Sequence, residues 1–71
     1  MKVFDRIRDY AVNMRRHAIV EPFPLSLAEA WELAAYVVDA RLMVKSVRAD
    51  EVIDSILKGR AEVCGCRLLV I

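Results

Sequence analysis

The sequence predicts a mainly α protein of the α+β class, with three helices followed by a C-terminal two-stranded β-hairpin. Three observations predict this fold. Apolar residues recur at helical spacing in three segments, two prolines separate the first segment from the second, and the ending AEVCGCRLLVI alternates around a Cys-Gly pair as hairpins do. Because 71 residues make one small domain, we expect residues 1–71 to fold as a single unit.

The first helix is predicted over about residues 2–17. Val3, Ile7 and Ala11 recur at intervals of four and lie on one side of such a helix, which leaves most of the arginines on the other. Basic residues near its end also suit the helix dipole. The simplest interpretation of this helix is an apolar face against the core and a solvated basic face.

A proline-containing linker is expected over residues 18–25. Pro22 and Pro24 hold the chain extended and keep the residues before them out of helical conformation. Phe23 stands between the prolines, and we expect it to anchor the linker to the core.

The second helix is predicted over about residues 27–43. Ser26 and Glu29 form a capping box, in which each side chain satisfies an unpaired backbone N–H at the helix start. Most of the remaining positions are apolar, so we expect the helix to be covered on most of its circumference, by the rest of the chain or by a second subunit. Trp31 and Tyr36 are expected to pack in the core.

A third helix is predicted over about residues 48–58, after a break around Lys45 and Ser46. Asp50 lies in its first turn, where it suits the helix dipole. Gly59 fits the left-handed position just past the end of a helix.

The ending predicts a hairpin over residues 61–71. With Cys64 and Gly65 at the turn, Glu62 faces Arg67 across the strands, and this pairing of opposite charges favours the register. The alternate residues then form a core-facing side: Ala61, Val63, Cys66, Leu68 and Val70.

Leu69 and Ile71 remain on the outward side of the longer strand. A two-stranded hairpin is marginal by itself, so we expect the free edge of this strand to pair with a twin strand in a homodimer or with a target protein. Arg67, Leu69 and Ile71 are therefore the candidate partner-binding residues. The pattern does not distinguish self-association from binding to a target.

No catalytic constellation is recognisable. The single histidine, His17, follows two arginines at a helix end, and neither a base with an orienting group nor a glycine-rich phosphate loop accompanies it. The two cysteines are too few for a disulfide framework and lack the CxxC spacing of zinc ribbons. We therefore expect no enzyme activity, no cofactor and no metal, although a redox or metal role of Cys64 and Cys66 stays open.

Charge and hydropathy limit the location and the partners. The net charge is +1, and 58% of residues are hydrophobic, which is high for a small domain and favours a protein partner. Charged residues at 5, 6, 8 and 9 interrupt the stretch that a signal peptide needs, so a cytoplasmic protein is expected. The apolar segment 25–44 contains four charged residues, so we expect a core helix there and no membrane span.

The segments LSLAEAWEL and EVIDSILKGRAEV, followed by a hairpin, are similar in order to the small winged-helix proteins of the excisionase and MerR type. The resemblance implies a DNA-binding transcriptional regulator. Acidic residues occupy the helix that would enter the major groove, where they repel phosphates. Arg8, Arg15 and Arg16 of the first helix are therefore the candidate nucleic-acid contacts in this alternative.

The function that we expect first is a small non-enzymatic protein-binding module. It would act as a regulator, adaptor or inhibitor, for example as a phage-type accessory protein, by occupying the surface of a partner protein, and we expect it to be a homodimer. The high apolar content and the expected free strand edge favour this interpretation.

Overall fold

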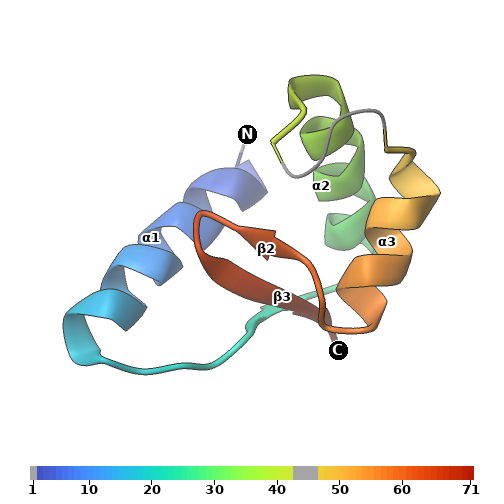
Figure 1. Cartoon of the computed structure of the whole chain (residues 1–71). Helices are drawn as coiled ribbons and strands as arrows, with labels where there is room; N and C mark the ends of the chain where they lie inside the picture. Colours follow the sequence, from blue (N-terminus) through green and yellow to red (C-terminus); the bar gives the residue numbers. More distant parts are fainter. Residues whose placement is uncertain (1, 43–46) are drawn as a thin grey trace.

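A computed structural model describes residues 2–42 and 47–71 of the chain. Within these ranges six elements follow one another: α1 (Lys2–His17), β1 (Phe23–Leu25), α2 (Leu27–Ala40), α3 (Ala49–Leu57), β2 (Glu62–Val63) and β3 (Cys66–Val70). Figure 1 shows α1 on one side, the pair α2 and α3 on the other, and the hairpin of β2 and β3 between them. The predicted class, mainly α with some β, is confirmed.

The sheet contains a third strand that the sequence analysis had placed in the linker. Its strand order is β1-β3-β2, so β3 is the central strand. β1 pairs with β3 in parallel, with Phe23 beside Leu68 and Leu25 beside Val70. The N–H of Ile71 continues the ladder by donating to the carbonyl of Leu25 at 3.0 Å. The expected free edge on β3 is therefore wrong, because β1 occupies it.

Pro24 is compatible with strand β1 because of the direction of its backbone. The carbonyl of Leu25 points at β3, where it accepts the N–H of Ile71. Backbone groups of successive residues in a parallel ladder point to opposite sides, so those of Pro24 face away from β3. The proline thus removes no ladder hydrogen bond, and it leaves the outer edge without an N–H at that residue.

The hairpin has the predicted register. Glu62 lies opposite Arg67, and Val63 lies opposite Cys66. Cys64 and Gly65 form the two-residue turn, with φ angles of 56° and 78°. Two successive positive φ values define a type I′ turn, whose twist matches that of the flanking strands.

The capping box at the start of α2 is confirmed. The N–H of Glu29 donates to the hydroxyl of Ser26 at 3.2 Å, and the N–H of Ser26 donates to the carboxylate of Glu29 at 3.1 Å. The other end of the helix differs from the prediction, because Arg41 adopts a left-handed conformation with φ 52° and ends the helix after Ala40. The expected end at Met43 lies outside the described residues.

The other two helices lie close to their predicted bounds. α1 has the expected limits, and α3 is one residue shorter at each end than predicted. Gly59 has φ 67°, which confirms its left-handed position after α3. The expected break at Lys45 and Ser46 falls outside the described residues. Among the helices of the described part, none combines the length and apolar character that a membrane span requires.

One cluster of buried side chains connects the helices to the sheet. Its largest fully buried members are Ile7, Leu25, Leu33, Val37, Ile56 and Leu68. Phe23 joins this cluster as expected, with 5% of its surface exposed. Its ring packs edge-on against Tyr10 at a centroid distance of 5.0 Å, and the guanidinium of Arg6 lies over it. These contacts attach the start of β1 to the first helix.

Candidate functional site

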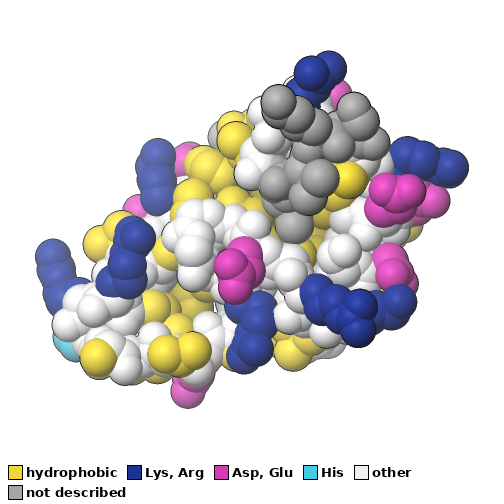
Figure 2. All heavy atoms as spheres, in the orientation of Figure 1, with side chains coloured by type: hydrophobic (Ala, Val, Ile, Leu, Met, Phe, Trp, Pro, Cys, Tyr) yellow, Lys and Arg dark blue, Asp and Glu magenta, His cyan; other side chains and the backbone are white. Residues whose placement is uncertain are grey.

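A cleft of about 300 Å³ lies where the end of α1, the following connector and the hairpin turn meet. Its walls are largely apolar and include Ala11, Met14, Ile19 and Val20. In Figure 2, hydrophobic surface is visible at the lower left, close to the histidine at the end of α1. The cleft is within the size range of small-ligand pockets.

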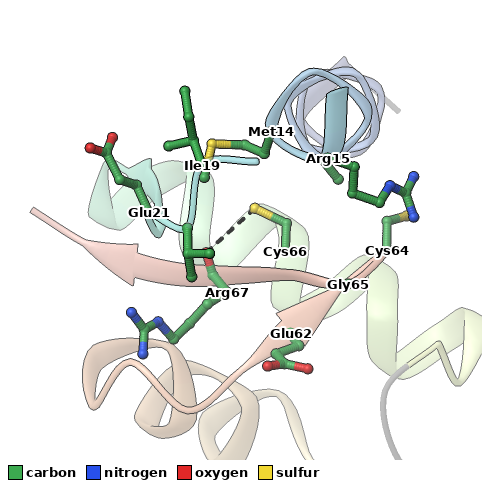
Figure 3. Close-up of a pocket in the computed structure, with 11 residues that line it drawn as sticks. Met14, Arg15, Ile19, Glu21, Glu62, Cys64, Gly65, Cys66 and Arg67 are labelled. Carbon is green, nitrogen blue, oxygen red and sulfur yellow. Dashed lines mark hydrogen bonds between the residues drawn. The ribbon is translucent and has the colours of Figure 1, made fainter. Parts of the chain in front are cut away.

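Two arginines that the sequence assigned to different functions both line this cleft. Arg15 comes from α1 and Arg67 from β3, and Glu21 and Glu62 line it as well. In Figure 3, the side chains of Arg67 and Glu62 extend from the strands away from Cys66. The balance of basic and acidic residues gives the cleft no preference for a ligand of one charge.

The two cysteines differ in exposure and direction. Both are free thiols, Cys64 exposed and Cys66 buried. Exclusion of water raises the pKa of the Cys66 thiol, which donates to the carbonyl of Arg67 at 3.6 Å. Figure 3 shows Cys66 pointing toward the side of Met14 and Ile19, whereas Cys64 points toward Arg15. This conformation does not direct the two sulfur atoms at a common ligand.

The described residues contain no obvious centre for metal or acid–base chemistry. Within residues 2–42 and 47–71, no three side chains of His, Cys, Asp or Glu are grouped so that they could hold a metal ion. No polar side chain of these ranges is buried either.

The remaining candidate residues are dispersed. Arg8 forms an exposed ion pair with Asp5 at 3.3 Å, and Arg16 is exposed one residue before the end of α1. Leu69 is half-buried and lies close to Gly59, whereas Ile71 is 85% exposed. Since β3 has strands on both sides, Leu69 and Ile71 do not border an open edge. That they contact a partner stays a prediction, but the free strand edge on which it rested is absent from the described structure.

A row of exposed apolar side chains follows helix α2. Leu27 and Trp31 are 53% and 46% exposed, Ala35 is exposed and Val38 is half-buried. These residues are three or four positions apart, so they lie on one face of the helix. We call Leu27, Trp31, Ala35 and Val38 the α2 apolar surface. It runs beside the row that faces the core, which consists of Ala30, Leu33, Ala34 and Val37.

Acidic side chains lie along the border of the α2 apolar surface that is away from the core-facing row. Glu32 and Asp39 are exposed and seven residues apart, so they are on the same side of the helix. No ion pair connects either of them to another residue of the described ranges, whose pairs are formed by Asp5, Glu29, Asp50 and Asp54. Their charges are thus available to a molecule that approaches α2.

Glu29, on the same helix, is already engaged. Its carboxylate accepts the backbone N–H of Ser26 and forms an ion pair with Arg6. The backbone of Ser26 is the largest cause of a lowered pKa of Glu29, followed by the Ser26 hydroxyl and the Arg6 guanidinium. Glu29 therefore stabilises the helix start and the contact between α1 and α2.

Trp31 was missed as a functional residue because α2 has two adjacent apolar rows. The expectation that Trp31 packs in the core is wrong, whereas Tyr36 is half-buried and packs against Phe4 at a centroid distance of 5.4 Å. Periodicity alone could not decide which row faces the core, since both have helical spacing. The small residues Ala30 and Ala34 were the available signal, because they allow a neighbouring element to approach closely.

Comparison with known proteins gave no match for this chain among protein families, curated proteins or solved structures.

Proposed function

We propose that this chain is a small non-enzymatic protein-binding module, which acts as a regulator, adaptor or inhibitor by covering part of a partner's surface. The observation that carries the proposal is the α2 apolar surface. Its centre is Trp31, a residue type that is enriched in the hot spots of protein interfaces. Full burial of an exposed leucine contributes about 1.5–3 kcal/mol, so covering Leu27, which is 53% exposed, would contribute about half of that.

The proposal transfers partner binding from the edge of β3 to helix α2. Strand β1 already pairs with the edge of β3 that was expected to be free, so a partner strand cannot be added there and the proposal does not rely on Leu69 and Ile71. Helix α2 instead offers side chains that need no backbone pairing. The proposal keeps the homodimer as the state of the module, and light scattering of the purified chain tests it.

The test is a selection of random peptides, long enough to form several helical turns, on the immobilised protein. Enriched peptides are then measured for binding to the wild type and to the Leu27→Asp variant. We expect related sequences to be enriched and to lose most of their affinity for Leu27→Asp, because the substitution places a charge on the α2 apolar surface.

The matched control is Val12→Asp, which changes a 46% exposed valine on α1. Binding to this variant should equal binding to the wild type. Absence of any enriched sequence, or equal loss of binding in both variants, contradicts the proposed function.

The second candidate function is that of a small winged-helix-like DNA-binding regulator. The observation in its favour is the order of elements, since α2, α3 and the hairpin follow one another as the resemblance implied. Both basic residues flanking α3 already pair with acidic neighbours, Arg48 with Asp50 at 3.2 Å and Lys58 with Asp54 at 2.8 Å. DNA binding would therefore depend on the arginines of α1.

A DNA titration at increasing salt separates the two functions. A DNA-binding regulator should show affinity that falls steeply with salt and weakens in Arg15→Ala and Arg16→Ala. The protein-binding module should show no such binding and no sensitivity to these two substitutions.

A further inference from the structure

We infer that the α2 apolar surface binds a basic amphipathic helix of a partner protein. The apolar residues of that helix would contact Leu27, Trp31 and Ala35, and its lysines or arginines would face Glu32 and Asp39. This inference rests on the proposed function and adds the chemical class of the partner.

Spacing on α2 supports a helical partner. The exposed members Leu27, Trp31 and Ala35 are four residues apart on three successive turns, so they form a continuous apolar ridge inclined by about 26° to the helix axis. A partner helix with apolar residues at matching intervals can place one side chain against each turn. An extended strand would have a different repeat and would gain little from this surface.

Charge complementarity indicates that the partner carries positive charge. Glu32 and Asp39 border the row, and neither forms an ion pair with another described residue. Within α2 itself, Leu27–Ala40, there is no lysine or arginine. A partner with lysines or arginines beside its apolar face would therefore meet opposite charges, whereas an acidic partner or a nucleic acid would meet like charges.

A second copy of the chain fits this surface less well. If two α2 helices pack antiparallel about a two-fold axis, the two acidic rows fall on the same side of the interface. Glu32 and Asp39 of one copy would then lie beside the same residues of the other, and like charges at that distance repel. The acidic border thus favours a different, basic partner.

The test uses two model peptides with the same helical spacing of leucine, one with lysine and the other with glutamate at the polar positions. Trp31 is the only tryptophan of the chain and lies in the centre of the surface, so its fluorescence reports binding directly. We expect the Leu/Lys peptide to shift the emission of Trp31 to shorter wavelength with saturation. The Leu/Glu peptide should produce at least about tenfold weaker binding.

Charge reversal on the protein provides the decisive variant. In Glu32→Lys/Asp39→Lys the preference should invert, so that the Leu/Glu peptide binds better than the Leu/Lys peptide. The control variant Asp9→Lys/Glu21→Lys has the same net charge but changes exposed residues on α1 and the connector. It should keep the preference of the wild type, and circular dichroism should show both variants folded.

Each outcome decides between the inference and the proposed function. Equal binding of the two peptides, or an equal effect of both charge reversals, overturns the inference that the partner helix is basic. If the peptide selection described above enriches acidic or uncharged sequences that depend on Leu27, the proposed function holds and the inference fails. A doubling of mass that shifts the Trp31 emission without any peptide identifies a second copy as the occupant and also overturns the inference.

Discussion

At the scale of single residues, the ends of the described helices share a feature. Ala18, Arg41 and Gly59 all have positive φ, at 53°, 52° and 67°. In each case the next residue donates its N–H to a carbonyl five positions earlier, as Ile19 does to Met14 at 3.0 Å. This is the Schellman arrangement, which satisfies the last carbonyls of a helix.

The sequence predicted the left-handed conformation at only one of these three ends, because only Gly59 has the residue type that signals it. Alanine and arginine adopt left-handed φ values at a cost of about 1–2 kcal/mol relative to ordinary backbone. The surrounding hydrogen bonds hold them there, and no local pattern indicates it. The end of α2 was placed too late for this reason.

We predict that Ala18→Gly raises the free energy of unfolding by about 0.5–1 kcal/mol, because glycine has no Cβ that opposes the left-handed conformation. Urea unfolding of both proteins measures the change. The reverse substitution, Gly59→Ala, should lower stability by about 1 kcal/mol. A Cβ at residue 59 would meet Leu69 Cδ1 at 3.5 Å, an ordinary contact, so the loss would come from the backbone. A loss of stability in Ala18→Gly would contradict this account.

A second prediction at this scale concerns pH. The pKa of the Glu29 carboxyl in the folded chain is below its ordinary value of 4.5. The largest cause is the hydrogen bond that its carboxylate accepts from the backbone N–H of Ser26. The stabilisation from this group is fully present above the ordinary pKa and is lost as the pH falls through the lowered, folded-state pKa. The wild type should therefore lose stability relative to Glu29→Gln below pH 4.5.

Urea midpoints of the wild type and Glu29→Gln, measured from neutral pH to about pH 2, test this expectation. The difference between the two proteins isolates Glu29, since all other carboxyl groups titrate in both. A difference that stays constant across this range would contradict the role assigned to the capping box.

At the scale of elements, the hairpin and the third strand show what local patterns can and cannot predict. The Cys64-Gly65 turn and the Glu62 to Arg67 pairing are local, and the sequence predicted both. The pairing of β1 with β3 connects residues 23–25 with residues 68–70. Nothing near Phe23 or Leu25 indicates that partner, and the two prolines indicated a linker.

We predict that Leu25→Ala destabilises the chain by about 3 kcal/mol, because Leu25 is 1% exposed and connects β1 to the core. Pro24→Ala, at the neighbouring exposed position, should cost less than about 1 kcal/mol, mainly through greater freedom of the unfolded chain. Thermal or urea unfolding compares the two. Equal losses would indicate that β1 is fixed by its backbone geometry and not by the burial of Leu25.

At the scale of the whole molecule, the chain combines a small core with several large hydrophobic side chains that remain exposed. Large hydrophobic side chains are exposed on every helix, including Val12 on α1, Trp31 on α2 and Leu57 on α3. The high hydrophobic content was visible in the composition, and part of it lies on the exposed side of the helices. Its position on α2 was not visible, because that required knowledge of which apolar row faces the core.

We predict that the emission of Trp31 in the purified chain is that of an indole in contact with water and does not change with protein concentration. The reason is that 46% of its surface is exposed and the acidic border opposes self-pairing of α2. Fluorescence and light scattering on the same dilution series test this. If a homodimer forms without a change in emission, it uses a different surface; if both change together, the α2 apolar surface is consumed by self-association.

The central position of β3 also determines when the sheet can form during synthesis. β3 follows every other described element in the sequence, yet it stands between β1 and β2. Neither neighbouring strand has its partner until residues 66–70 have been made, so the backbone groups of β1 that pair with β3 stay unpaired until then. A released chain that ends at Gly65 should therefore be cleaved readily by proteases at the connector, and protection should appear only when β3 is included.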